Sequence, residues 1–169
     1  MIYPIVKYPN LVLEKATPPV TAFDDDFRKL IDDMFESMYA AQGVGLAATQ
    51  IGKSVRVAVI DVSNGKNPEA RLVLANPEIT HAEGEQREEE GCLSLPSFRG
   101  MVMRPLFVTV RAQNVTGEPW EMRGENLLAR AFCHEIDHLD GVLFIQHLGM
   151  LKRDLIRRKI RKLQKAGEW

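Results

Sequence analysis

Residues 125–139 read Glu-Asn-Leu-Leu-Ala-Arg-Ala-Phe-Cys-His-Glu-Ile-Asp-His-Leu, and this stretch decides the expected fold. Its apolar side chains recur every three or four positions, which is typical of a helix with one buried face. Gly141 follows shortly, and glycine is common just after a helix C-terminus. We therefore predict a core helix over 125–139. The repeating apolar positions are Leu127, Leu128, Ala131, Phe132, Ile136 and Leu139.

The same stretch contains a histidine pair at helical spacing. Positions i and i+4 lie on one helix face, so His134 and His138 could hold one divalent metal. Glu135 follows the first histidine, cannot easily reach the same cation, and remains free for proton transfer. This pattern is the outline of a hydrolytic metal site on the core helix.

Cys92, in the segment Glu90-Gly91-Cys92-Leu93-Ser94-Leu95-Pro96, is the candidate third ligand. A free cysteine is usually a small buried hydrophobe, but two available histidines favour its interpretation as a ligand. A Cys/His/His set leaves one coordination position open for catalysis. Cys133 adjoins His134, yet adjacent helical residues diverge by about 100°, so we predict that Cys133 is a packed thiol.

Several shorter elements surround this helix. Helix-start residues at 21–26 precede an apolar repeat that continues to Gly43 and predicts a second helix. The glycine-rich apolar segment 43–52 indicates a backbone that closely approaches another group. Strands and helices do not alternate regularly, which favours an α+β fold with short antiparallel strands packed around the core helix, plus a C-terminal helix. Strands are predicted over 55–62, 71–75, 106–112 and 119–122.

The 169 residues correspond to one ordinary domain, and 45% hydrophobic with 27% charged residues argues against a disordered or membrane protein. No apolar run approaches the roughly 20 residues of a membrane span, and the N-terminal residues do not resemble a secretion signal. Two cysteines without such a signal suggest a reducing compartment. We expect a cytoplasmic protein with no membrane partner.

Charge is distributed unevenly. Residues 149–169 hold eight Lys or Arg against two acids, net +6, which leaves the first 148 residues with 14 basic against 21 acidic residues, net −7. Leucine and isoleucine recur at helical spacing in this tail, so it is expected to form a helical extension, 149–169, of a catalytic domain, 1–148. Its basic face could be solvated, bind nucleic acid or lie on a membrane surface.

Two other classes of protein compete with a small hydrolase. A zinc peptidase would need a third ligand downstream, for which Asp140, His147 and Asp154 are the candidates. Asp140 points to another helix face, and no histidine occupies the farther position of the extended peptidase motif, so this hypothesis is weaker. The other alternative is an RNA-binding or ribosome-binding module with a structural metal site.

Three segments together resemble the bacterial peptide deformylases: Gly43 to Gln50, Glu90 to Ser94 and His134 to His138. They occur in the family's order with similar spacing and span most of the chain. The resemblance implies a metal-dependent hydrolase that removes the N-formyl group from formylmethionine at the N-terminus of nascent polypeptides and releases formate.

The resemblance also implies roles for particular residues. Cys92, His134 and His138 would bind one divalent metal per chain, while Glu135 would serve as general base and then general acid. The Gln50 side-chain amide and the Leu93 backbone N–H would stabilise negative charge on the formyl oxygen. Ferrous iron is implied in the cell, whereas zinc, nickel or cobalt also suit these ligands and could occupy the purified protein.

Other family positions concern the substrate and the support of the metal. Val44, Leu127 and Ala131 would form walls for the methionine side chain, although core packing could also explain them. Gly45 would allow close approach of the peptide and Arg99 would contact its backbone. Glu90 and Arg104 match an ion pair beside the metal loop, and Asp137 could orient the site. At positions 88 and 130 this chain has Glu88 and Arg130, where some relatives of the family have aliphatic residues.

In bacterial members of this family, a C-terminal helix docks near the ribosomal exit tunnel. The resemblance therefore implies that 149–169 contacts ribosomal RNA and protein where nascent chains emerge, and such phosphate contacts should weaken strongly with salt.

Overall fold

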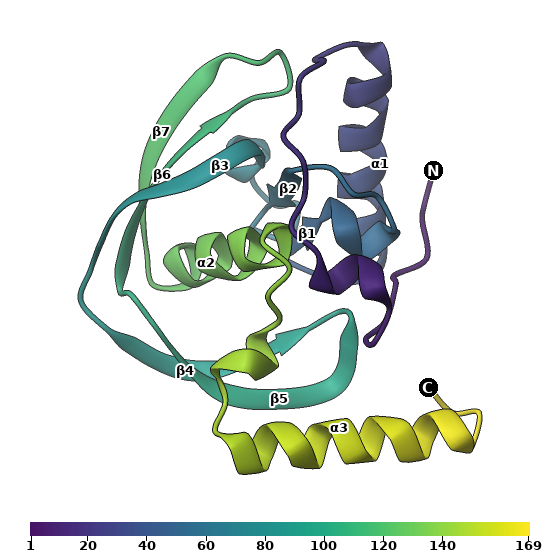
Figure 1. Ribbon diagram of the computed structural model, residues 1–169. Helices are drawn as coiled ribbons and strands as arrows, with labels where there is room; N and C mark the ends of the chain where they lie inside the picture. The colour runs from purple at the N-terminus through teal and green to yellow at the C-terminus, as the bar shows by residue number, and fades with distance from the viewer.

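The computed structural model describes residues 1–169 and has the predicted α+β architecture. Helix α2 (Leu127–Leu139) contacts strands of two antiparallel sheets (Figure 1). The larger sheet has the order β1-β2-β3-β6-β7, and the smaller one pairs β4 with β5. The strands are β1 (Gly45–Ala47), β2 (Val57–Ile60), β3 (Leu72–Glu83), β4 (Gln86–Cys92), β5 (Leu95–Arg104), β6 (Phe107–Gln113) and β7 (Pro119–Glu125).

Helix α2 confirms the predicted core helix and its end, where Gly141 takes a left-handed conformation with φ of 77°. The helix begins at Leu127 and not at 125, because Glu125 is the last residue of β7. Phe132 and Leu139 are fully buried, and burial of one such side chain stabilises the fold by about 1.5–3 kcal/mol. Leu127, by contrast, is 51% exposed. The apolar rhythm therefore identified the helix but included one residue that lies outside the core.

Helix α1 (Asp25–Ala40) is the second predicted helix, and its first turn is capped by Asp24, whose side chain accepts a hydrogen bond from the Phe27 N–H at 3.0 Å. Strand β2 lies in the interior between α1 and α2. Val57 and Val59 pack in the cluster with α1, whereas Ala58 and Ile60 pack in the cluster with α2. Burial on both faces explains the continuous apolar run of this strand.

The predicted strands exist, but several extents differ. Strand β3 continues to Glu83, well beyond 75, β7 continues to Glu125, beyond 122, and β2 is shorter than 55–62. The β4–β5 hairpin was not predicted. Segment 43–52 forms β1 and the 3₁₀ turn η2 (Ala48–Ile51). The remaining 3₁₀ turns are η1 (Leu11–Glu14), η3 (Pro68–Ala70) and η4 (Phe144–His147).

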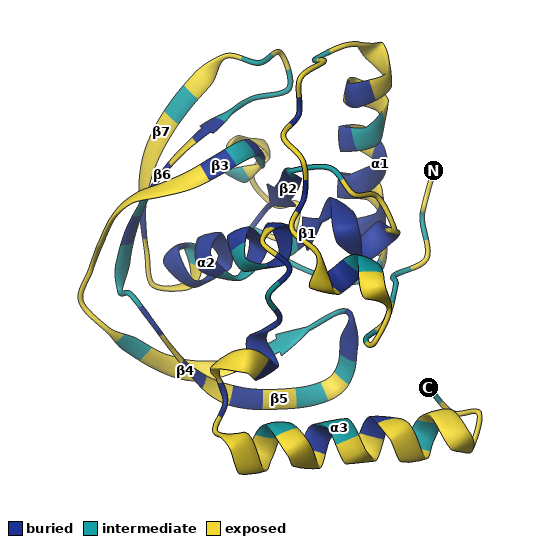
Figure 2. Ribbon diagram, in the orientation of Figure 1, coloured by how far each residue is buried: buried dark blue, intermediate teal, exposed yellow.

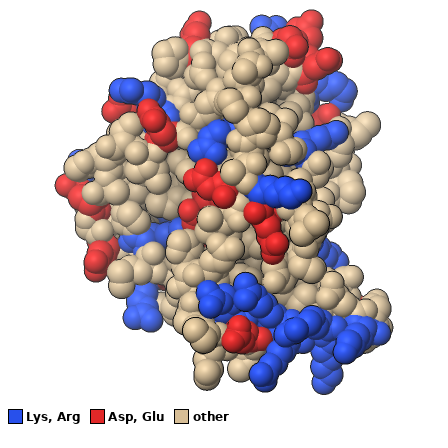
Figure 3. Space-filling model, in the orientation of Figure 1, with Lys and Arg blue, Asp and Glu red and all other residues tan.

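Helix α3 (Met150–Lys165) runs beside β5 and presents a mostly exposed outer surface (Figures 1 and 2). Ile156 and Ile160 are buried in a cluster that includes Leu95 and Val102 of β5. Beyond the helix, the Trp169 indole N–H donates to the Tyr8 carbonyl at 2.6 Å. Lys and Arg side chains gather over α3 at the lower edge of Figure 3. None of the helices combines the length and apolar character that a membrane crossing requires.

Candidate metal centre

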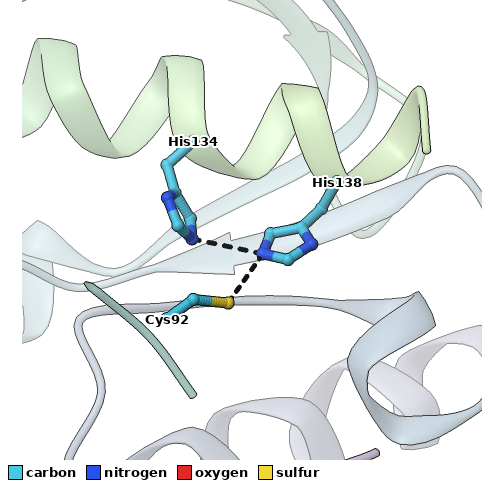
Figure 4. Close-up of side chains that lie close together, drawn as sticks. All are labelled: Cys92, His134 and His138. Carbon is cyan, nitrogen blue, oxygen red and sulfur yellow. Dashed lines mark hydrogen bonds between the residues drawn. The ribbon is translucent and has the colours of Figure 1, made fainter. Parts of the chain in front are cut away.

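Cys92, His134 and His138 meet at the interface between β4 and α2 (Figure 4). Cys92 is the last residue of β4, and the histidines occupy successive turns of α2. One ligand atom from each residue lies within 4.8 Å of the others. His138 Nε2 is 3.3 Å from Cys92 Sγ and 3.2 Å from His134 Nε2. The hairpin that the sequence did not reveal therefore carries the thiol to the histidine pair.

These separations fit a shared divalent cation. Two imidazole nitrogens bound to one tetrahedral ion at about 2.0–2.1 Å stand about 3.3 Å apart, and a thiolate sulfur stands about 3.5 Å from each nitrogen. Burial lowers the pKa of His138 well below its ordinary value and favours the neutral form that binds metal. For His134, burial acts in the same direction, but the neighbouring Cys92 thiol and the hydrogen-bonded Glu90 carboxylate raise the pKa well above its ordinary value. Cation binding should therefore displace a proton here.

Glu90 orients His134 from behind. Its Oε1 lies 2.6 Å from His134 Nδ1, which directs Nε2 of that ring toward Cys92 and His138. Arg104 contacts both Glu90 oxygens, at 2.7 Å and 3.2 Å. Burial acts to raise the pKa of Glu90, but His134 and Arg104 together hold it well below its ordinary range. The predicted Glu90 and Arg104 pair is thus present and buried, with both side chains 5% exposed.

Two further members of this network, Arg130 and His147, were not predicted for this position. Arg130 Nη1 donates to Glu90 Oε2 at 2.6 Å, and Arg130 Nη2 donates to the Val102 carbonyl at 3.1 Å. Where some relatives have an aliphatic residue, this chain therefore places a second buried cation beside Glu90. Asp137 accepts from Arg104 at 2.7 Å and lies 2.9 Å from His147 Nε2. Pairing of distant charges leaves no local sequence pattern, and therefore no signal marked Arg130 or His147 for this position.

Glu135 is buried beside the metal ligands, at 4% exposure. Its Oε1 has no hydrogen-bond partner in the protein, and a buried carboxylate oxygen without a partner is costly unless another molecule supplies one. A Cβ built on Gly45 would lie 2.5 Å from Glu135 Oε2. Because Gly45 has no side chain, its backbone can lie against the Glu135 carboxylate, which is the close approach expected of segment 43–52. Burial raises the pKa of Glu135 to about 7.

Gln50 is held in a fixed orientation next to the thiol. Its Oε1 accepts from the Ala47 N–H at 3.0 Å, so its Nε2 turns toward Cys92 Sγ at 3.5 Å and Ser94 Oγ at 3.2 Å. Only 1% of Gln50 is exposed, although it lies in a 3₁₀ turn and not in a regular element. An amide donor is therefore aimed at the centre before any substrate arrives.

A cavity of about 520 Å³ opens beside the ligands, and it is lined by all five residues predicted to bind substrate: Val44, Gly45, Arg99, Leu127 and Ala131. Leu93 and Arg130 also line it, whereas Glu88 does not. The Leu93 side chain packs against the α1 cluster, and its Cδ1 would lie 2.8 Å from a Cβ on Gly43. Arg99 covers Gly91 and donates to Glu89 at 2.9 Å.

The competing candidates lie elsewhere. Asp140 pairs with Arg56 at 2.8 Å, His147 contacts Asp137, and Asp154 is exposed on α3. Cys133 is buried, and burial raises its pKa to about 11, in agreement with the prediction of a packed thiol. The described residues contain no other group of three His, Cys, Asp or Glu side chains placed to share an ion.

Comparison with known proteins gives a consistent match. The sequence profile of the family described as polypeptide deformylase matches residues 2–154. A peptide deformylase of Acidobacterium capsulatum is 63% identical over 169 residues, covering 100% of this chain and 99% of the relative. One from Alkalilimnicola ehrlichii is 48% identical over 98% of this chain and 93% of the relative.

Solved structures agree with the sequence matches. The crystal structure of a peptide deformylase from Legionella pneumophila superposes with a TM-score of 0.92 at 46% identity, covering 99% of this chain and 98% of that one. The peptide deformylase structure from Plasmodium falciparum gives a TM-score of 0.89 at 32% identity, with 96% of each chain covered.

Proposed function

The chain belongs to the polypeptide deformylase family, and we propose that Cys92, His134 and His138 form its catalytic metal centre. It is an enzyme that removes the N-formyl group from formylmethionine at the N-terminus of nascent polypeptides. The observation that carries the assignment of the centre is the meeting of one sulfur and two ring nitrogens beside a buried carboxylate, Glu135.

A divalent cation suits this ligand set. When bound, it would supply a Lewis acid that lowers the pKa of a water molecule and polarises the formyl oxygen. We propose ferrous iron in the cell, since a thiolate with two imidazoles accommodates it, and zinc, nickel or cobalt as alternatives in the purified protein. An iron centre with a partly exposed Cys92 would make activity sensitive to oxygen.

Glu135 is proposed to move the proton of the reaction. Its unpartnered Oε1 would accept a proton from the attacking water as the new C–O bond forms at the formyl carbon. The same carboxyl would return that proton to the departing amine nitrogen as the C–N bond breaks, which yields formate and a free amine. A pKa near 7 places Glu135 where both transfers are efficient near neutral pH.

Two donors are proposed for the negative charge that develops on the formyl oxygen. Gln50 Nε2 already faces Cys92, because the bond from Ala47 N–H fixes the other end of the amide. The Leu93 backbone N–H would be the second donor, while the Leu93 side chain packs in the core. A donor held in place before reaction stabilises the charge without a reorganisation cost.

The cavity supports the proposed methionine site. Val44, Leu127 and Ala131 would contact the thioether side chain, and the exposed surface of Leu127 agrees with a role outside the core. Gly45 would permit close approach of the peptide, and Arg99 at the rim would contact its backbone. The Glu90 network with Arg104, Arg130 and Asp137 would hold His134 in place.

We propose that residues 1–148 form the catalytic unit and that the basic face of α3 binds ribosomal RNA and protein near the exit tunnel. The clustering of Lys and Arg over α3 supports this contact (Figure 3).

A substrate assay tests the proposed function against a peptidase. The purified enzyme is incubated with formyl-Met-Ala, and formate, formyl-methionine and free alanine are quantified. We expect one formate per molecule of Met-Ala formed and no free alanine. Release of alanine without formate would instead establish a peptidase.

A further inference from the structure

One face of the β4–β5 hairpin exposes two methionines. Met101 and Met103 are 46% and 55% exposed and alternate with the buried Val102, so they point to the same side of β5 as Arg99. In the antiparallel register, Arg99 pairs with Gly91, Met101 with Glu89 and Met103 with Arg87. We refer to these six residues, Arg87, Glu89, Gly91, Arg99, Met101 and Met103, as the hairpin face.

The hairpin face is continuous with the substrate cavity. Glu89, Gly91 and Arg99 line that cavity, and Arg99 Nε donates to Glu89 Oε1 at 2.9 Å. Met101 lies directly opposite Glu89, and Met103 lies two residues farther along β5, opposite Arg87. The face therefore begins at the rim of the cavity and leads away from Cys92, the metal ligand at the end of β4.

We propose that the hairpin face binds the segment of the nascent polypeptide that follows the formylmethionine. The proposal rests on the proposed function, which places the formyl group beside Cys92 and the methionine side chain in the cavity. A chain leaving the cavity over Glu89 meets Met101 and then Met103. From Gly91 to Arg87 the strand advances four residues, about 13 Å at about 3.3 Å per residue. Contact therefore requires about four extended residues beyond the formylmethionine.

The chemistry of the face suits a substrate of variable sequence. Nascent polypeptides share the first residue and differ in the residues that follow. Methionine is flexible and polarizable, adapts to differently shaped apolar groups and is common on binding surfaces that accept many partners. The charged side chains of Arg87, Glu89 and Arg99 can meet polar groups of the same peptide. The face thus adds affinity without requiring one downstream sequence.

The test compares two substrates, formyl-Met-Ala and the hexapeptide formyl-Met-Ala-Ser-Leu-Val-Ser. For the wild type, we expect kcat/KM to be about tenfold higher on the hexapeptide, mostly through KM, as burial of two partly exposed side chains would give. M101Q/M103Q keeps side-chain length but adds polar amides, and it should reduce this ratio to about one while kcat/KM on the dipeptide stays unchanged. M101L/M103L should retain the ratio.

M122Q provides the matched control, because Met122 is 36% exposed on β7 and lies outside the cavity lining. A wild-type ratio of one, or a ratio that survives in M101Q/M103Q, would overturn the proposal. An unchanged ratio of kcat/KM values together with an altered sedimentation coefficient of M101Q/M103Q would also overturn the proposal, because the hairpin face would then join copies of the chain. Failure of the proposed function gives a different result, namely no formate from either peptide.

Discussion

Gly45→Ala is expected to impair proton transfer by displacing the Glu135 carboxylate. The new Cβ would lie 2.5 Å from Oε2, 2.9 Å from Cδ and 3.1 Å from Cγ of Glu135. Carbon and oxygen atoms in contact stand about 3.3 Å apart or more, so Oε2 must retreat by about 0.8 Å. Misplacement of a catalytic group by about 1 Å costs about 10²-fold in rate. We therefore expect kcat on formyl-Met-Ala to fall about 10²-fold.

Steady-state formate release, metal content and thermal unfolding of the variant separate this effect from a damaged fold. Metal content should be unchanged, because the affected atoms belong to Glu135 and not to the ligands. Gly149→Ala is the matched control, since a Cβ at Gly149 meets no heavy atom within 4 Å. A Gly45→Ala enzyme with wild-type kcat would refute the placement of Glu135 as the proton carrier.

Four further predictions concern Glu135, its surroundings and α3. Glu135→Gln should retain metal but lose about 10²- to 10⁴-fold in kcat. Because Glu135 must be ionised to act as a base, the kcat/KM of the wild type should rise with pH through about 7. A flat wild-type profile in a pH-rate measurement would contradict this role. Arg130→Met should lower the denaturant-derived stability by about 1.5–3 kcal/mol, because Glu90 loses one charge-assisted hydrogen bond but keeps Arg104. A change below about 0.5 kcal/mol would count against a structural role for this contact. Deletion of 149–169 should abolish cosedimentation with ribosomes, and ribosome binding equal to wild type would exclude α3 as the contact. The deletion should also lower the melting temperature, because burial of Ile156 and Ile160 contributes about 1.5–3 kcal/mol each. Dipeptide hydrolysis should survive well below that temperature.

Strong periodicity made the helices and several strands predictable. In α2, apolar positions recur at the helical period and Gly141 marks the end, so fold and histidine geometry followed from the same residues. The run of Val57 to Ile60 was also readable as a strand, because both of its faces are buried.

The β4–β5 hairpin was not predictable in the same way. Its charged run Glu88-Glu89-Glu90 has a low strand propensity, and the strand forms because Glu90 is buried by distant partners. The pairing of Glu90 with Arg104 was expected from the family resemblance, but its second partner, Arg130, was not. Such contacts depend on the three-dimensional arrangement and leave no local periodic signal.

Metal stoichiometry of the Cys92→Ala variant tests the central claim most directly. Protein purified without oxygen is analysed for iron, zinc, nickel and cobalt in three forms, the wild type, Cys92→Ala and Cys133→Ala. The buried Cys133 thiol lies outside the donor group, so its variant controls for loss of a sulfur. We predict about one metal ion per chain in the wild type and Cys133→Ala, and close to none in Cys92→Ala. Full metal content in Cys92→Ala would contradict a centre built from this thiol and the two histidines.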